Sequence, residues 1–353
     1  KNFAAILVGT ILCSTMVGQA SSVPGEKDSE FAEVQSIMDR LDQAEEIQKV
    51  KVTASEVKKV LYMGGKKGAE LVQELIESAE PVPEPVFSDM ETQQTMEPEE
   101  EYGYRHNTLT GETEKVAYAG EPAERPYLTQ EDVAGFTPSP MPRSFPGNWY
   151  EVNPARYLDT RSTCKLLIFT DKGTGSGSGF LIEQDRIATA AHCVYNSEHA
   201  DDNWVDSIMI IPACMSTSPY QPYEIAESTS ITVPTNWANN QSDFQNDYAV
   251  VHLDTWFSFS LLEKLVPGNA INGWWVRAQG YPYSSDNMYL IGGNITSNTN
   301  QELVINNEQF KGSSGGPVLD ERKYVIGIIS RGGGGETHAV KFTSQIVNNL
   351  MTW

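Results

Sequence analysis

The sequence predicts an all-β domain over residues 148–353, preceded by a helical region and an acidic linker. Two observations carry the β assignment. Short runs rich in β-branched and aromatic residues follow one another closely and are separated by Gly, Pro, Asn and Ser, which is typical of a barrel or a sandwich. Helical periodicity returns only in the C-terminal run SQIVNNLMTW, which predicts a final helix. With 39 % hydrophobic residues, the chain can form a core.

A secretory signal is expected at residues 1–20. Lys1 precedes the apolar run FAAILVGTILCSTMV, and Gly18 and Ala20 occupy the small-residue positions before a break. This run is too short for a comfortable membrane span, and no later stretch is long and apolar enough for one. We therefore expect a secreted, extracellular protein with no membrane association after the signal is removed.

Residues 21–80 predict a helical pro-region made of short, highly charged helices. Thr53 and Glu56 match a capping box at the start of a second helix, which the sequence MGG ends. The run AELVQELIESA predicts a third helix. The first helix is indicated by apolar residues that recur every three or four positions, which places them on one face. These residues are Phe31, Val34, Met38, Leu41, Ala44 and Ile47.

An acidic linker is expected at residues 81–147, where Pro and Glu dominate in PVPEPVF, METQQTMEPEEE and FTPSPMPRSFPG. A segment of this composition buries too little apolar surface to offset its ordering entropy, so we expect it to be extended. Residues 21–150 contain 26 acidic and 12 basic residues, which together give −14 of the total charge of −22.

The mature protein is expected to lack the residues from 21 to about 150, because exposed linkers are where proteolytic nicking concentrates. Arg143 is the favoured cleavage site, with Arg156 and Arg161 as alternatives. Cleavage requires an activating protease or self-cleavage. The sequence leaves open whether the pro-region is an inhibitor, a folding aid or a spacer.

The net charge of −22 argues against nucleic acid or an anionic membrane as a partner, since no Lys/Arg cluster of the required size is present. Protein or peptide substrates are the expected partners. No spacing of Cys or His suggests a metal site, so we expect no metal and no cofactor. After Cys13 leaves with the signal, Cys164, Cys193 and Cys214 remain. An odd number in an oxidising compartment predicts one disulfide and one thiol.

Three sequence contexts together predict an activated serine. Ser314 lies between glycines in KGSSGGP, His192 follows a strand in IATAAHCVYN, and Asp247 begins an apolar strand in NDYAVVHLD. A serine nucleophile needs a base that takes its proton and an acid that orients the base. The backbone N–H groups of Gly312 and Ser314 form the expected oxyanion hole.

The string GSSGG also matches the nucleophile elbow of the α/β-hydrolases. That fold requires the order Ser, acid, His and a helix after the elbow. Here only His338 follows Ser314, and PVLDERKYVIGII begins with proline and predicts a hairpin. The α/β-hydrolase interpretation therefore fails.

The motifs TAAHC, DYAVV and GSSGGP resemble those of the chymotrypsin-like serine proteases. The runs SPYQPYE, PTNW, QGYP and VIGI make the part from about residue 150 onward similar to the glutamyl endopeptidase branch, mostly bacterial secreted enzymes. The resemblance implies a double barrel with six strands in each half. His192 and Asp247 are then expected on the first half and Ser314 on the second. With the pro-region, this predicts a secreted serine endopeptidase made as a zymogen.

The sequence departs from this family at two points. The cysteine that often precedes the GFLI strand is missing, so Cys193 is expected to pair with Cys164 or Cys214, or to stay reduced. The histidine that reads a substrate carboxylate directly after VIGI is replaced by Ile329. The second departure leaves the preferred residue before the scissile bond open.

An acidic preference needs a substitute cation, for which Lys311, Arg331 and His338 are available, because burying a carboxylate without a partner is costly. An apolar pocket lined by Ile329 and a basic preference directed by Glu308 are the alternatives. The candidate residues of the specificity pocket are Gln309, Lys311, Ile329, Ser330, Arg331, Gly332 and His338.

Two other functions remain open. A protease-like domain with a masked or unused active site would act as a binding module, and an esterase or a narrow processing protease would keep the same fold. Labelling by a fluorophosphonate separates the binding module from an enzyme, because only an activated serine reacts with it.

Overall fold

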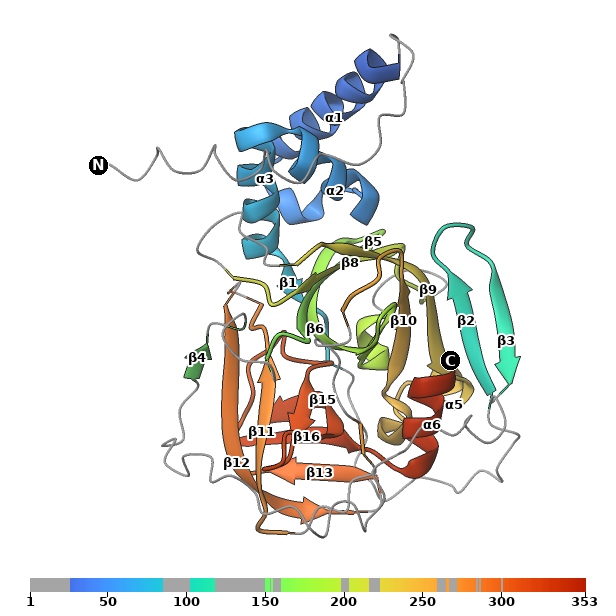
Figure 1. The fold of residues 1–353 in the computed structure, drawn as a ribbon, viewed down its shortest axis with the longest axis vertical. Coiled ribbons are helices and arrows are strands. Elements are labelled where there is room, and N and C mark those ends of the chain that lie inside the picture. The colour runs from blue at the N-terminus through green and yellow to red at the C-terminus, as the bar shows by residue number, and fades with distance from the viewer. Residues whose placement is uncertain are drawn as a thin grey trace.

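Two closed barrels, each of six antiparallel strands, form the body of the molecule (Figure 1). The expected double-barrel fold with a C-terminal helix is confirmed. The computed structural model describes residues 26–84, 102–117, 150–152, 154, 160–197, 203–215, 223–258, 265–266, 272–283, 285, 287–299 and 301–353. The expected signal at residues 1–20 lies outside these residues, as do most of the expected linker and Arg143 and Arg156.

The first barrel closes in the order β10-β7-β6-β5-β8-β9, because β9 also pairs with β10. Its strands are buried along most of their length, including β6, whose first half consists mainly of Gly and Ser. The six strands are β5 (Thr163–Thr170), β6 (Gly173–Glu183), β7 (Arg186–Thr189), β8 (Ser207–Pro212), β9 (Ala226–Pro234) and β10 (Ala249–Leu253).

The second barrel closes in the order β11-β14-β15-β16-β13-β12, with β12 paired to β11. The short strand β4 (Tyr150–Val152) extends it beside β12. The six barrel strands are β11 (Trp275–Gly280), β12 (Met288–Asn298), β13 (Glu302–Ile305), β14 (Pro317–Leu319), β15 (Val325–Gly333) and β16 (Glu336–Lys341).

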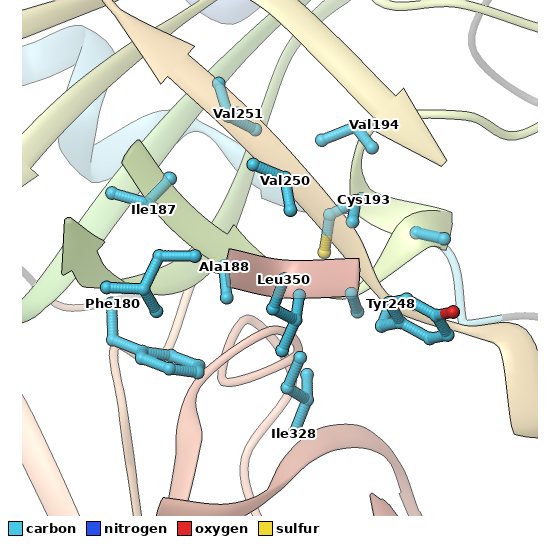
Figure 2. Packing of buried hydrophobic residues seen from close by; sticks show 14 of the residues in the cluster. Phe180, Ile187, Ala188, Cys193, Val194, Tyr248, Val250, Val251, Ile328 and Leu350 are labelled. Carbon is cyan, nitrogen blue, oxygen red and sulfur yellow. The ribbon is translucent and has the colours of Figure 1, made fainter. Parts of the chain in front are cut away.

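The C-terminal helix α6 (Ser344–Thr352) returns to the first barrel. Its Leu350 lies beside Phe180 and Ala188 of the first barrel and Ile328 of β15, as Figure 2 shows. One apolar cluster therefore joins both barrels and the helix. A fully buried side chain of this kind contributes about 1.5–3 kcal/mol.

The helices predicted for residues 21–80 are present as α1 (Glu26–Asp42), α2 (Ala54–Met63) and α3 (Gly65–Ser78). The capping box of α2 is confirmed, since Thr53 and Glu56 bond each other's backbone N–H groups. The helices pack over β5 and β8 of the first barrel (Figure 1), in a cluster that includes Leu75 and Met209. This shared core explains how short, charged helices become stable.

The apolar stripe predicted for the first helix is only partly correct. Val34, Met38 and Leu41 are buried, but Phe31 is 61 % exposed. The helix ends at Asp42, so the remaining two stripe residues follow it, and one of them, Ile47, is buried in the short 3-10 turn η2 (Ile47–Lys49).

Part of the predicted linker is folded, so the expectation of an extended segment is wrong there. Strands β2 (Tyr102–Asn107) and β3 (Thr113–Ala117) form a hairpin, and β2 pairs with β9 of the first barrel. Backbone pairing to an existing sheet edge stabilises a polar segment that has no core of its own. The structure also contains β1 (Glu80–Pro81), which pairs in parallel with β6.

None of the helices in the described parts of the chain has the length and apolar character needed to cross a membrane. The same residues contain no disulfide, because Cys164, Cys193 and Cys214 are not bonded to one another. The predicted disulfide is therefore not present. Cys193 lies instead against Gly177 of β6, where an added Cβ would be 3.2 Å from its sulfur.

Candidate active site

The imidazole of His192 and the carboxylate of Asp247 form a buried pair at one end of the first barrel. His192 lies in the 3-10 turn η5 (Ala191–Cys193) after β7, and Asp247 follows the turn η6 (Phe244–Asn246) before β10. The His192 Nδ1–Asp247 Oδ2 distance is 2.8 Å, and the backbone N–H of His192 donates to Oδ1 at 2.9 Å. With Nδ1–H donating to the carboxylate, Nε2 is available to accept a proton.

Opposing effects act on the pKa of His192. Burial, the largest single effect, lowers it, but Asp247 and Cys193 together raise it by more, and the net result is a pKa well above the ordinary value of 6.5. The base is therefore held ready to become an imidazolium next to a fixed negative charge.

Ser314 occupies a tight turn between β13 and β14, at the junction of the two barrels. Its hydroxyl donates to the carbonyl of Ser330 at 3.2 Å, and the Ser330 hydroxyl donates to Asp247 at 2.5 Å. The three residues predicted from separate motifs therefore meet in one hydrogen-bonded network. No hydrogen bond joins Ser314 to His192 within the described residues, and His192 Nε2 lies 3.7 Å from the Cys193 sulfur.

The Ser314 turn depends on glycines that adopt left-handed backbone angles. Gly312 has φ +93° and Gly315 has φ +87°. A Cβ on Gly315 would lie 2.1 Å from the Ser178 carbonyl, and one on Gly312 would lie 2.5 Å from the Tyr283 nitrogen. No other residue fits these positions without displacing backbone.

Backbone hydrogen bonds orient the two predicted oxyanion donors. The Lys311 carbonyl accepts from Tyr283 N, and the Ser313 carbonyl accepts from Gly316 N. In a trans peptide the N–H points opposite to the C=O, so the N–H groups of Gly312 and Ser314 are turned away from these partners. Within the described chain, neither N–H has an acceptor.

Ser178 of β6 supports this turn, although sequence reasoning did not identify it. Its hydroxyl donates to the Gly312 carbonyl at 2.9 Å, and its backbone N–H donates to the Ser314 carbonyl at 2.9 Å. It thus links the first barrel to the turn that carries Ser314. The strand GSGSGF carries no signal for this role, because the contact joins residues far apart in the chain.

Arg331 and His338, two predicted specificity residues, meet around a carboxylate that sequence reasoning missed. His338 Nδ1 lies 2.8 Å from Glu302 Oε1, and the Arg331 guanidinium lies 3.4 Å from the same oxygen. Arg331 also covers the Phe244 ring at 4.6 Å. Burial lowers the pKa of Arg331, and Glu302 opposes this effect.

The remaining specificity candidates differ in burial. Ile329 is buried in the core of the second barrel. Gln309 is 6 % exposed, and its amide has no hydrogen-bond partner among the residues that the structure describes. Lys311 is exposed at the rim, and Glu308 is exposed and accepts from Gly335 N at 3.1 Å.

Glu84, at the end of the described pro-region, also reaches this site. Its carboxylate accepts a hydrogen bond from the backbone N–H of Gly332 at 3.3 Å. Burial raises the pKa of Glu84, while the neighbouring His192, Lys311 and Arg331 lower it by a smaller amount. Sequence reasoning assigned Glu84 to a linker and could not identify this long-range contact.

Comparisons with known proteins agree with the fold. Residues 177–328 match a family model described as a trypsin-like peptidase domain. The chain is 23 % identical over 301 residues to a glutamyl endopeptidase of Bacillus licheniformis, which covers 76 % of this chain and 87 % of that protein. It is also 23 % identical over 189 residues to an extracellular metalloprotease of Bacillus subtilis, covering 50 % of this chain and 57 % of that protein.

A solved structure described as Glu endopeptidase in complex with MPD superimposes with a TM-score of 0.51 at 22 % identity, over 56 % of this chain and 93 % of that chain. The chain therefore has the fold of the chymotrypsin-like serine proteases. Among these it is similar to the glutamyl endopeptidase branch, and the family match supports a serine peptidase.

Proposed function

We propose that this chain is the precursor of a secreted serine endopeptidase that uses Ser314, His192 and Asp247 as a catalytic triad. The observation that carries the proposal is the network in which Asp247 holds His192 and, through Ser330, connects to Ser314. The trypsin-like family match supports it independently.

In the proposed reaction, Ser314 Oγ attacks the carbonyl carbon of a peptide bond while His192 Nε2 takes its proton. The N–H groups of Gly312 and Ser314 stabilise the oxyanion that develops. His192 then protonates the leaving amine, which leaves an acyl-enzyme on Ser314. Water attacks this ester, again with His192 as the base, and releases the acid.

Fluorophosphonate labelling and peptide hydrolysis test the proposal together. The probe should modify wild-type protein whose pro-region has been cleaved and removed, and it should not modify the Ser314→Ala variant, which should also lack peptidase activity. The buried Ser314 hydroxyl donates one hydrogen bond, to the Ser330 carbonyl. Because alanine removes only this bond, the variant should remain folded. A Ser314→Ala protein with wild-type turnover would contradict the assignment, and labelling without peptide hydrolysis would indicate an esterase or a narrower protease.

For the preferred substrate we propose an acidic residue before the scissile bond. Arg331 and Lys311 support this choice, since the positive charge of each lowers the pKa of the Glu84 carboxyl group at the site. His338 is engaged with Glu302, so we assign it a smaller role. Cleavage of a peptide library should occur mainly after Glu or Asp and should be weakened by Arg331→Ala. Cleavage after Leu or Phe would contradict an acidic pocket, and cleavage after Arg would indicate Glu308.

A further inference from the structure

The segment from Glu80 to Glu84 crosses the candidate active site from one barrel to the other. On the first barrel, Pro81 pairs with Ser176 of β6, and Val82 N donates to the Ser176 carbonyl at 3.1 Å. The segment then reaches β15 of the second barrel through Glu84. Its two ends therefore lie on opposite sides of the junction that holds Ser314.

Burial, close backbone approach and a hydrogen bond hold this segment against the first barrel. Val82 is 6 % exposed and belongs to the core of the first barrel. A Cβ on Gly175 would lie 3.2 Å from Val82, so the glycine at this position leaves room for the close approach. The Pro83 carbonyl accepts from the Asn196 side chain at 3.3 Å.

Both anchor points adjoin residues that form the site. Ser176 is two residues before Ser178, which holds the Ser314 turn, and Gly332 is two residues after Ser330, which bonds Asp247. The segment thus runs between residues that adjoin the catalytic network, and it ends near enough to His192 for that residue to lower the pKa of Glu84. Glu84 also occupies the Gly332 N–H, a backbone donor of the kind that binds extended peptides.

We infer that residues 80–84 are an intramolecular inhibitor that closes the catalytic cleft of the precursor, with Glu84 as its anchor on the second barrel. This inference rests on the proposed peptidase function. The helices α1–α3 hold the inhibitory segment in place, because Ala79 and Leu75 directly before it are buried against the first barrel. Lys311 and Arg331 act on the carboxylate of Glu84, and their positive charges would also favour an acidic side chain of a substrate.

The inhibitor can be tested by the rate at which a fluorophosphonate labels the intact 39.0 kDa chain, read from the full-length band. Intact wild-type protein should react slowly. Glu84→Lys places a cation beside Lys311 and Arg331, and it should increase the rate by about ten-fold or more, as expected for loss of a charged hydrogen bond. Glu84→Gln, which keeps an oxygen acceptor but removes the charge, should fall between the two.

Glu80→Lys is the matched control, because the Glu80 side chain lies on the same segment, is exposed and makes no hydrogen bond among the described residues, while its backbone pairing with β6 is kept. Its labelling rate should equal that of the wild type. Thermal unfolding of each variant verifies that the chain is folded. Glu84→Gln should disturb folding least, because it keeps the size of the side chain and an oxygen acceptor.

Two results would overturn the inference. Equal labelling rates for intact wild-type and Glu84→Lys chains would show that Glu84 does not close the cleft. Intact wild-type protein that reacts as fast as protein from which the cleaved pro-region has been removed would show the same for the whole segment. Failure of the proposed peptidase function is distinguishable, because no form of the protein would then be labelled at Ser314.

Discussion

Asp247 is a fully buried carboxylate whose charge is stabilised by three donors: the backbone N–H and Nδ1 of His192 and the hydroxyl of Ser330. Burying an unpaired carboxylate would cost several kcal/mol. The donors offset this cost and also fix the imidazole orientation. The same contacts therefore stabilise the residue and prepare the base.

Asp247→Asn should reduce kcat by about 10⁴-fold, because an amide nitrogen cannot accept from His192 Nδ1–H and the wrong tautomer is favoured. The measurement is peptide hydrolysis by the cleaved enzyme, with the circular dichroism spectrum as a check on folding. Ser330→Ala is the matched comparison, since it removes one donor but keeps the carboxylate, and it should cost less activity. Wild-type kcat in Asp247→Asn would rule out Asp247 as the orienting acid.

The pKa of His192 should be measurable by NMR titration of the imidazole in the Ser314→Ala protein. We expect a pKa above 6.5, because the effects of Asp247 and Cys193 together outweigh that of burial. The stabilisation from the ion pair is then fully present below pH 6.5 and is lost as the pH rises through the raised pKa.

Replacing Asp247 by Asn in the same background should lower the His192 pKa, since burial then acts without the carboxylate. An unchanged pKa in the double variant would show that Asp247 does not cause the shift. Because a general base must be neutral, the same raised pKa places the acid limb of activity above pH 6.5.

At the scale of elements, β6 connects most parts of the site. It pairs with β1 of the pro-region, it carries Ser178 under the Ser314 turn, and its Gly177 faces Cys193 beside His192. A single strand thus contacts the inhibitory segment, the nucleophile turn and the base turn. This explains why the sequence GTGSGSGF is rich in small residues, which allow close approach of neighbouring backbone.

Gly177→Cys should form a disulfide with Cys193. The added Cβ would lie 3.8 Å from the Cys193 Cβ, which is about the mean Cβ–Cβ distance of disulfides. Closing a loop of this length should stabilise the protein by about 3 kcal/mol. The measurements are a thiol titration and the melting temperature under oxidising and reducing conditions.

Gly179→Cys is the control for this change, because Gly179 lies on the same strand but faces Ala188, Ile187 and Leu166. It should add one thiol to the titration and should leave the melting temperature unchanged. A Gly177→Cys protein that gains a thiol instead of losing one would show that the two strands are not placed as described.

At the scale of the whole molecule, the pro-region is attached to the first barrel by three separate contacts. The helices share a core with β5 and β8, β1 pairs with β6, and the β2–β3 hairpin pairs with β9. Cleavage of the chain at Arg143 breaks none of these contacts. The activation that we propose therefore requires release of the pro-region as well as cleavage.

After cleavage at Arg143, the pro-region should co-elute with the protease domain in size-exclusion chromatography. Val57→Asp should weaken this association, because Val57 is fully buried in the core shared with the barrel and a buried unpaired charge is costly. Lys66→Asp introduces the same residue on the neighbouring helix at an exposed site and should have no effect. Separation of the wild-type fragments directly after cleavage would contradict the prediction.

The sequence by itself determined the double-barrel fold, the C-terminal helix, the capping box of α2, and His192, Asp247 and Ser314 as candidate site residues. Strand patterns indicated an all-β domain, a Thr–Glu pair marked a helix start, and the resemblance of short motifs to a known family implied the double barrel. A local pattern can be recognised without knowing which parts of the chain meet.

Only the tertiary structure decided the partners of Arg331 and His338 at Glu302, the support of the Ser314 turn by Ser178, and the contact of Glu84 with Gly332. It also decided the state of the cysteines, because Cys193 faces Gly177, whereas Cys164 lies near Cys214. Each of these contacts joins residues far apart in the chain. Their formation depends on how the barrels close and pack, which residue order and composition alone do not specify.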